Sequence, residues 1–297
     1  MNPASTPAVI GAFVVCCLIW GTTWLAIRVG LEGVPPFTGV SLRFGLAAVI
    51  VLGIAVARRV PLGRSARERW LWLTNGTLSF AGSYGIVYWA EQWVPSGLTA
   101  VLFATYPLFV AVLAHLVVPG ERVAALELAG ILVGFAGVGV IFSEDLRLLV
   151  GEGVPFAAAV MLASPFVSAL SSVAIKRWGA GIHPLSLTGV PMAIGSALTG
   201  LVALATERDA TFVWDSRSIG ALLYLTLLGS VVTFTLYYWL LQRMPVKRLA
   251  LIAYVIPVEA VLLGTLLDEP FSPRILAGSA LVVGGVALAV RPRPGRG

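Results

Sequence analysis

Apolar residues in this chain fall into long runs that are separated by short polar stretches. A helix needs about 20 mostly apolar residues to cross a lipid bilayer, and ten runs reach or approach that length. They are Ala8 to Ile27, Pro36 to Ala57, Trp70 to Ala90, Gly97 to Val118, Leu126 to Phe142, Gly153 to Ile175, Pro184 to Ala205, Ile219 to Leu241, Leu249 to Leu267 and Ile275 to Val290. The pattern predicts an all-α polytopic membrane protein with ten transmembrane helices.

The sequence also repeats itself after about 150 residues. Six positions recur at unchanged gaps: Tyr88-Trp89, Gln92, Pro95, Ala100 and Pro107 match Tyr238-Trp239, Gln242, Pro245, Ala250 and Pro257. Ala26-Ile27-Arg28 matches Ala174-Ile175-Lys176 at a spacing of 148. Each half carries five helices, an odd number, so the second half should enter the membrane in the opposite sense. We therefore expect an inverted five-plus-five repeat, with halves at residues 1–148 and 149–297.

Composition and charge agree with a membrane protein. The chain is 58% hydrophobic and 11% charged, which is too apolar for the surface of a soluble globule. With the N-terminus inside, fourteen Lys and Arg residues fall on the inner loops and five on the outer ends. This positive-inside bias predicts cytoplasmic termini and explains the net charge of +6 without a nucleic-acid partner. The first run lacks a basic leader and is expected to stay as a helix.

The residue types that enzymes need are sparse. His115 and His183 are the only histidines, and no metal-binding histidine spacing or paired carboxylate motif occurs. No Gly-x-x-x-x-Gly-Lys-Ser/Thr phosphate loop is present either. The adjacent Cys16 and Cys17 cannot form an ordinary disulfide with each other. We expect no enzyme, no metal and no cofactor.

Two prolines stand at matching places inside the fourth and ninth runs. Pro107 and Pro257 each remove a backbone hydrogen bond and bend a helix. One interpretation is that these prolines only shape the packing of the helices. The other is a hinge or a cavity-lining bend at the same depth in both halves, which the symmetric placement favours.

Tyrosines are concentrated in the two best-repeated segments. Tyr106 and Tyr254 lie deep in their helices, where a phenol hydroxyl needs a partner or water, so a cavity wall is expected there. Aromatic residues near helix ends also fit an interfacial belt, and helical packing is an alternative for Trp20. Serines in the sixth run share one helical face, which is either a pocket wall or a set of backbone-bonded hydroxyls. The expected substrate-binding set is Trp20, Tyr84, Tyr88, Tyr106, Ser168, Tyr238 and Tyr254.

Two formal charges fall deep inside apolar runs, and such residues are costly when they face lipid. Arg43 in the second run either snorkels to the outer interface or faces the interior of the bundle. Glu259 in the ninth run lies near mid-helix and is expected to be protonated, paired or cavity-facing. Glu259 is the candidate for proton coupling, and the alternative is a structural carboxylate in a facilitator.

The order of several short motifs resembles a known family. They are Trp20-Gly21, Pro36 followed by Arg43, Pro95-Ser96-Gly97-Leu98-Thr99-Ala100, Pro107, Gly120-Glu121-Arg122 and Asp268-Glu269-Pro270. Together with the repeat, they resemble the EamA family of the drug/metabolite transporter superfamily, and within it the YddG-type bacterial amino-acid and metabolite exporters. The resemblance covers nearly the whole chain and implies a central cavity and the export of small metabolites.

The sequence therefore predicts a secondary transporter that exports small amino acids and related metabolites across a bacterial inner membrane by alternating access. A nucleotide-sugar or phosphorylated-metabolite antiporter is the first alternative, although phosphate recognition should require several deep basic residues. A non-transporting membrane scaffold or lipid-binding subunit is the second. The expected partners are a small-molecule substrate and the lipid bilayer, with no nucleic acid, and the chain acts as a monomer or a dimer.

Overall fold

The structure is a computed structural model that describes residues 6–141, 143, 153–256 and 273–290. Its described residues form helices and connecting turns, with no strand among them. Two of the helical segments, η1 and η3, are π-helical. The elements are α1 (Thr6–Leu31), α2 (Pro36–Ala57), α3 (Ala66–Asn75), η1 (Gly76–Ser83), α4 (Tyr84–Ala90), α5 (Ser96–Phe103), α6 (Tyr106–Val117), α7 (Ala125–Ile141), α8 (Val154–Met161), α9 (Ala163–Trp178), α10 (Pro184–Thr206), α11 (Ser216–Thr226), η3 (Leu227–Val232), α12 (Thr233–Leu241), α13 (Val246–Leu249) and α15 (Pro273–Val290).

The helices follow the apolar runs closely. The second run, Pro36 to Ala57, coincides with α2, which starts where proline can occupy the first helical turn without losing a hydrogen bond. Within the described residues, six helical segments are long and apolar enough to cross a membrane, and two further apolar helices are shorter. The ninth predicted run lies mostly outside the described residues. An all-helical membrane fold is thus confirmed, whereas the predicted number of ten spans is not.

The bundle surface is apolar, as a lipid-facing surface should be. Leu25, Val49 and Leu116 are each more than half exposed on the outside of α1, α2 and α6. Such side chains are favourable against lipid tails and unfavourable against water. The interior, in contrast, contains fully buried polar residues whose contacts join distant helices.

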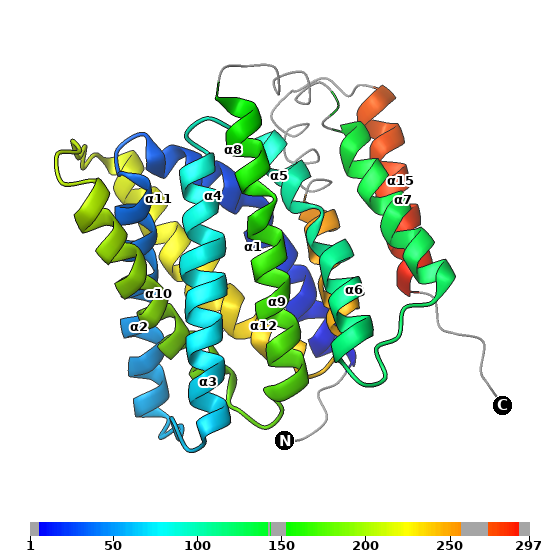
Figure 1. Ribbon diagram of the computed structural model, residues 1–297, viewed down its shortest axis with the longest axis horizontal. Coiled ribbons are helices and arrows are strands. Elements are labelled where there is room, and N and C mark those ends of the chain that lie inside the picture. Colours follow the sequence, from blue (N-terminus) through cyan, green and yellow to red (C-terminus); the bar gives the residue numbers. More distant parts are fainter. Residues whose placement is uncertain (1–5, 142, 144–152, 257–272, 291–297) are drawn as a thin grey trace.

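Helix α7 and helix α15 lie side by side at one end of the bundle (Figure 1). Glycines allow this close approach: a methyl group added at Gly137 would come within 2.7 Å of backbone atoms of Gly278 and Val282. A methyl at Gly130 would be 2.6 Å from backbone atoms of Gly285 and Ala289. Small residues at helix contacts permit tight packing in membranes. The fifth and tenth helices therefore pack against each other within one chain.

The helix containing Pro107 is interrupted just before that proline. Helix α5 ends at Phe103 and helix α6 begins at Tyr106, with Pro107 in its first turn. Proline fits at the start of a helix, where its missing N–H has no helical partner anyway. The helix is therefore interrupted beside the predicted bend, and the use of Pro107 as a hinge stays a prediction. The matching residue, Pro257, lies outside the described residues.

Candidate functional site

Arg43 stands in the interior of the bundle and does not reach toward the membrane surface. Its side chain on α2 is fully buried, and its Nε donates to Ser230 Oγ at 2.8 Å. Nη2 donates to the Gly229 carbonyl oxygen at 3.1 Å, and Nη1 to the Tyr88 hydroxyl at 3.3 Å. Burying a guanidinium is costly unless its donors are satisfied. These four residues, Arg43, Tyr88, Gly229 and Ser230, are termed the arginine centre.

The π-helical segment η3 provides two of the three acceptors of the arginine centre, the Gly229 carbonyl and the Ser230 hydroxyl. A π-helical turn inserts an extra residue and redirects side chains and carbonyl groups, often at functional sites. Within η3, the Gly229 carbonyl also accepts a hydrogen bond from Trp20 Nε1 at 3.4 Å. Adding the repeat spacing of 150 to η1 (Gly76–Ser83) gives residues 226–233, which span η3 (Leu227–Val232). Both halves thus carry a π-helical segment at the same place.

Asn75, immediately before η1, forms a second buried polar group. Its Oδ1 accepts from the hydroxyls of Ser171 at 2.8 Å and Tyr238 at 3.0 Å, and its Nδ2 donates to the Leu187 carbonyl at 3.0 Å. Buried amides are expensive unless they are hydrogen-bonded in this way. Asn75, Ser171 and Tyr238 are termed the asparagine centre. The sequence analysis missed Asn75, although a lone amide inside an apolar run was a usable signal.

A third group consists of three hydroxyls on three helices. Tyr106 of α6 donates to Ser172 Oγ of α9 at 2.9 Å, and Tyr237 of α12 donates to the same oxygen at 3.0 Å. The two phenol oxygens are 2.7 Å apart. These residues, all buried, are termed the tyrosine–serine trio. The trio gives the Tyr106 hydroxyl the hydrogen-bond partner that a phenol deep in a membrane helix needs.

Phe234 connects the aromatic residues around these centres. Its ring makes edge contacts with Trp20 at 5.3 Å and Tyr84 at 5.8 Å between ring centroids, and it stacks near Tyr238 at 6.1 Å. The Arg43 guanidinium lies 5.0 Å from the centroid of the Tyr84 ring, a cation–π distance. Phe234 was not singled out from the sequence, because one phenylalanine among thirteen carries no distinguishing pattern.

The structure brings most of the predicted site residues together. Trp20, Tyr84, Tyr88, Tyr106 and Tyr238 belong to one aromatic and polar cluster with its surrounding apolar core. Ser168 is half-buried on α9, one helical turn from Ser172 of the trio. Whether these side chains bind a substrate stays a prediction.

Tyr254 lies apart from this cluster. It belongs to a separate core formed with α7 and α15, where its hydroxyl donates to the Ile131 carbonyl at 2.9 Å. Its ring occupies the space beside Gly134, where a methyl group would come within 2.8 Å of it. Glu259, the other deep titratable residue that the sequence suggested, lies outside the described residues.

Charged residues form a network at the edge of the bundle that is lower in Figure 1. Lys176, at the end of α9, donates to the Leu241 and Met244 carbonyls at 2.9 and 2.8 Å and lies 3.8 Å from Glu121. Glu121 accepts from the backbone N–H groups that open α13, at 3.0 and 3.4 Å. Lys247 forms an ion pair of 2.7 Å with Glu127. Glu121, Glu127, Lys176 and Lys247 are termed the lower-edge network.

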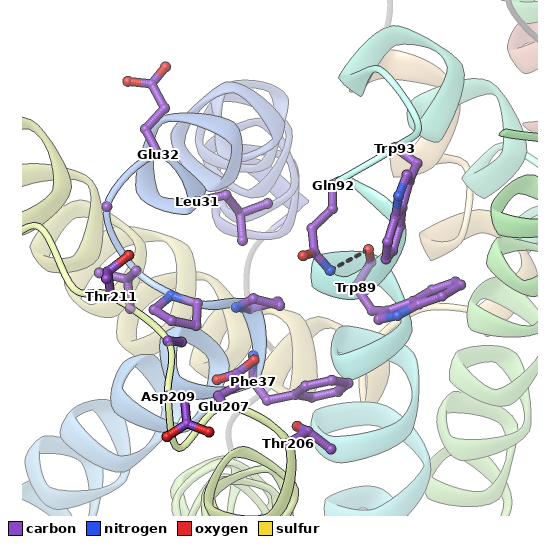
Figure 2. A pocket seen from close by; sticks show the side chains of 15 residues that line it. Leu31, Glu32, Phe37, Trp89, Gln92, Trp93, Thr206, Glu207, Asp209 and Thr211 are labelled. Atoms are coloured by element: carbon purple, nitrogen blue, oxygen red, sulfur yellow. Dashed lines mark hydrogen bonds between the residues drawn. The ribbon is translucent and has the colours of Figure 1, made fainter. Parts of the chain in front are cut away.

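A pocket of about 720 Å³ opens near the opposite edge. It lies between the turn joining α1 to α2, the residues after α4 and the end of α10, and Figure 2 shows Trp89, Gln92 and Trp93 on one wall. On the other wall, Glu207 accepts hydrogen bonds of 2.8 Å from the backbone N–H groups of Phe37 and Thr38. This carboxylate therefore caps α2, whose N-terminus favours a negative charge. The site is termed the upper pocket.

Comparisons with known proteins agree with this architecture. The model of the EamA-like transporter family matches residues 7–143 and again residues 155–291. The inner membrane transporter YedA of Escherichia coli (strain K12) is 32% identical over 264 residues, covering 86% of this chain and 81% of that protein. The transporter YoaV of Bacillus subtilis (strain 168) is 26% identical over 270 residues, covering 91% of this chain and 92% of that protein. Neither name specifies a solute.

A solved crystal structure shares the fold. It superposes with a TM-score of 0.79 at 22% sequence identity and covers 95% of this chain and 97% of the other. The helices, their buried polar centres and the two matches to one family model define a membrane transporter built from two repeats. The chain belongs to the EamA-like transporter family, as the sequence motifs predicted.

Proposed function

We propose that this chain is a secondary transporter that exports small amino acids and related metabolites across a bacterial inner membrane by alternating access. The observation that supports this most strongly is where the buried polar contacts lie. Arg43 bonds to Ser230, Asn75 to Tyr238, and Tyr106 to Ser172. Each contact joins a residue of the first family match to one of the second. In rocking-type transporters the substrate lies at such an interface between repeats.

The chemistry of these centres suits a zwitterion. A guanidinium can bind a carboxylate through two parallel hydrogen bonds. Aromatic faces attract an ammonium group. The amide oxygen of Asn75 and the hydroxyl oxygens of Tyr106 and Tyr237 can accept hydrogen bonds from it. A solute entering the interface would take over hydrogen bonds that the two halves now make with each other. We infer that amino acids with varied side chains are accepted.

A nucleotide sugar or phosphorylated metabolite fits less well. Of the basic residues in the described part of the chain, Arg43 alone belongs to the three buried centres, whereas a phosphate is usually bound by several cations. A non-transporting scaffold or lipid-binding subunit would need no polar centre between its halves. We therefore favour amino-acid export over these two alternatives.

Solute flux in proteoliposomes tests the proposal. The purified full-length protein is reconstituted, and exchange of radiolabelled amino acids, nucleotide sugars and sugar phosphates is measured against protein-free liposomes. We expect saturable exchange of several small amino acids. Exchange restricted to phosphorylated solutes would support the antiporter instead, and no exchange of any solute would contradict a transporter of this substrate range.

The membrane orientation is also part of the proposal. The loop after α2 and the end of α9 lie at the lower edge in Figure 1. The loop carries Arg58, Arg59 and Arg64, and the last turn of α9 carries Arg177, so we place this edge in the cytoplasm. The two repeats are then inverted relative to each other. A single cysteine at position 64, in a background without Cys16 and Cys17, should be labelled only by reagents that reach the cytoplasm. Labelling from outside would contradict the orientation.

The lower-edge network then closes the cytoplasmic end of the path. Glu121→Gln removes the charge that faces Lys176 and one of the two oxygens that accept from the backbone of α13. Hydrogen bonds to charged groups contribute about 1.5–3 kcal/mol, so opening should become easier by on the order of tenfold. The measurement is the rate at which a cytoplasmic maleimide labels a cysteine placed at Ser168.

The matched control is Asp209→Asn, which changes an exposed carboxylate at the upper pocket. This variant should label at the wild-type rate. If Glu121→Gln also labels at the wild-type rate, the lower-edge network does not close the path.

A further inference from the structure

Glu91 carries a buried carboxylate that the fold leaves without a hydrogen bond. The residue follows the last residue of α4, and its exposed fraction is 0%. Neither Oε1 nor Oε2 has a hydrogen-bond partner in the described part of the chain. A buried polar group normally has such a partner, because leaving it unpaired costs free energy. A carboxylate in this state calls for a reason beyond packing.

The second repeat shows that the scaffold does not need a carboxylate at this position. Arg28 at the end of α1 donates to the backbone carbonyl of Glu91 at 2.7 Å. Lys176, which matches Arg28, donates to the carbonyl of Leu241 at 2.9 Å, and Leu241 matches Glu91 at the repeat spacing of 150. Leu241 is equally buried. The helix end therefore needs only a backbone acceptor at this position, so the Glu91 side chain is an addition.

The charged and titratable groups facing Glu91 come from three helices. They are Arg28 of α1, Arg43 of α2 and, one turn earlier on α4, the phenol of Tyr88. Burial raises the pKa of the Glu91 carboxyl well above its usual range, and the guanidinium groups of Arg28 and then Arg43 act in the opposite direction. Burial thus favours the neutral form of the Glu91 carboxyl, and the two cations favour its charged form.

The upper pocket lies next to Glu91 along the chain. Trp89 and Gln92, which flank Glu91 closely in the chain, both line that pocket (Figure 2). Arg43, in turn, belongs to the arginine centre, where the solute is expected to bind. Glu91 thus has residues of the upper pocket as close neighbours in the chain and faces Arg43, one of the residues that join the two halves.

We propose that Glu91 is a proton-binding site that couples solute export to proton entry in this transporter, a role that rests on the proposed function. A proton from water in the upper pocket forms an O–H bond with the carboxylate and cancels its charge. The attraction of Arg28 and Arg43 to Glu91 is then lost, and Arg43 is left to the solute carboxylate. When the path opens to the other side, the O–H bond breaks and the proton leaves to cytoplasmic water. This proposal assigns to Glu91 the role that the sequence suggested for Glu259.

Protonation can be tested without any solute. The reconstituted full-length protein is titrated by infrared difference spectroscopy, which detects the C=O stretch of a neutral carboxyl group. Wild type should show a band that titrates at a higher pH than ordinary carboxyl groups. Glu91→Gln and Glu91→Leu, which copies Leu241, should lack the band. The control Glu32→Gln, an exposed carboxylate paired with Arg217, should keep it. A band that persists in both Glu91 variants overturns the proton site.

Coupling is tested with radiolabelled alanine as the probe. Accumulation driven by an imposed pH gradient should fall at least tenfold in Glu91→Gln, whereas exchange of alanine at equal pH should persist. Gradient-driven accumulation that persists in this variant, a wild type indifferent to the gradient, or loss of both activities in the variant would each contradict the coupling. If the wild type carries neither alanine nor any other solute of the panel, the proposed function fails, and the infrared titration alone decides whether Glu91 binds a proton.

Discussion

Arg43→Leu should abolish solute exchange, with a loss of at least a hundredfold relative to wild type. The substitution removes the donors for Ser230 Oγ and the Tyr88 hydroxyl and one of the two donors for the Gly229 carbonyl, all inside the bundle. Each buried polar group left unpaired costs about 1–3 kcal/mol. The solute also loses its only cationic partner among the three buried centres. Exchange of labelled amino acids at equal reconstituted protein measures the effect.

Arg43→Lys separates charge from geometry. Lysine keeps the positive charge but carries one nitrogen, which cannot reach acceptors arranged around a planar guanidinium. We expect this variant to fold, with a melting temperature closer to that of wild type than Arg43→Leu, yet to exchange solute at least tenfold more slowly. Arg217→Leu, at a largely exposed position, is the control and should exchange normally. Wild-type exchange by Arg43→Lys would contradict a binding role for the guanidinium.

Gly285→Ala should lower the stability of the protein far more than Gly284→Ala, although the two positions are adjacent. A methyl at Gly285 would clash with the Gly134 backbone nitrogen and come within 2.6 Å of the Gly130 carbonyl oxygen, so α7 and α15 must move apart. Forcing extra volume into a close contact costs about 1–3 kcal/mol. A methyl at Gly284 meets nothing within 4 Å. Thermal unfolding in lipid nanodiscs, followed by tryptophan fluorescence, measures the difference.

The same comparison can be made on the other helix. Gly137→Ala should destabilise, because the added methyl would meet backbone atoms of α15, while Gly139→Ala has open space around it. Equal melting temperatures for the two members of each pair would show that the contact between α7 and α15 adjusts freely. A rigid contact of this kind fits a scaffold against which the other helices move.

The repeat and the apolar runs allowed much of the fold to be predicted. The length of the second apolar run and the proline at position 36 were enough to locate α2. The thickness of the membrane sets the length of a spanning helix, and proline favours the first turn of a helix. Arg43 could be identified as a candidate site residue because a charged side chain that faces lipid costs free energy. These features depend on the sequence near one position, so they need no knowledge of neighbouring helices.

The orientation of each helix about its own axis could not be read in the same way. Helices that are apolar all around carry no amphipathic stripe to indicate the buried face. Tyr254 was accordingly grouped with Tyr106 by depth, although its ring packs against α7. The π-helical segments η1 and η3 were also missed, because no residue pattern marks them. Glu91 lies at a helix end in the sequence, and only the structure shows that it is buried near Arg28 of α1 and Arg43 of α2.

Contacts at the two edges bear on the proposed alternating access. At the lower edge, Lys176 and Glu121 connect the end of α9 to the start of α13. At the upper edge, Arg28 makes the repeat-related contact with Glu91, beside an open pocket. A cycle that exchanges these contacts in turn would expose the buried centres first to one side and then to the other. The charged residues at the two edges would determine whether the state open to one side or the state open to the other is favoured.

A structure of the full-length protein with a transported amino acid bound tests the central claim most directly. The account predicts the solute between the two halves, with its carboxylate within hydrogen-bond distance of the Arg43 guanidinium and its ammonium group near Asn75 or the tyrosine–serine trio. Arg43 should then have given up at least one of its bonds to Gly229 and Ser230. A solute bound only in the upper pocket, with the arginine centre unchanged, would contradict the account.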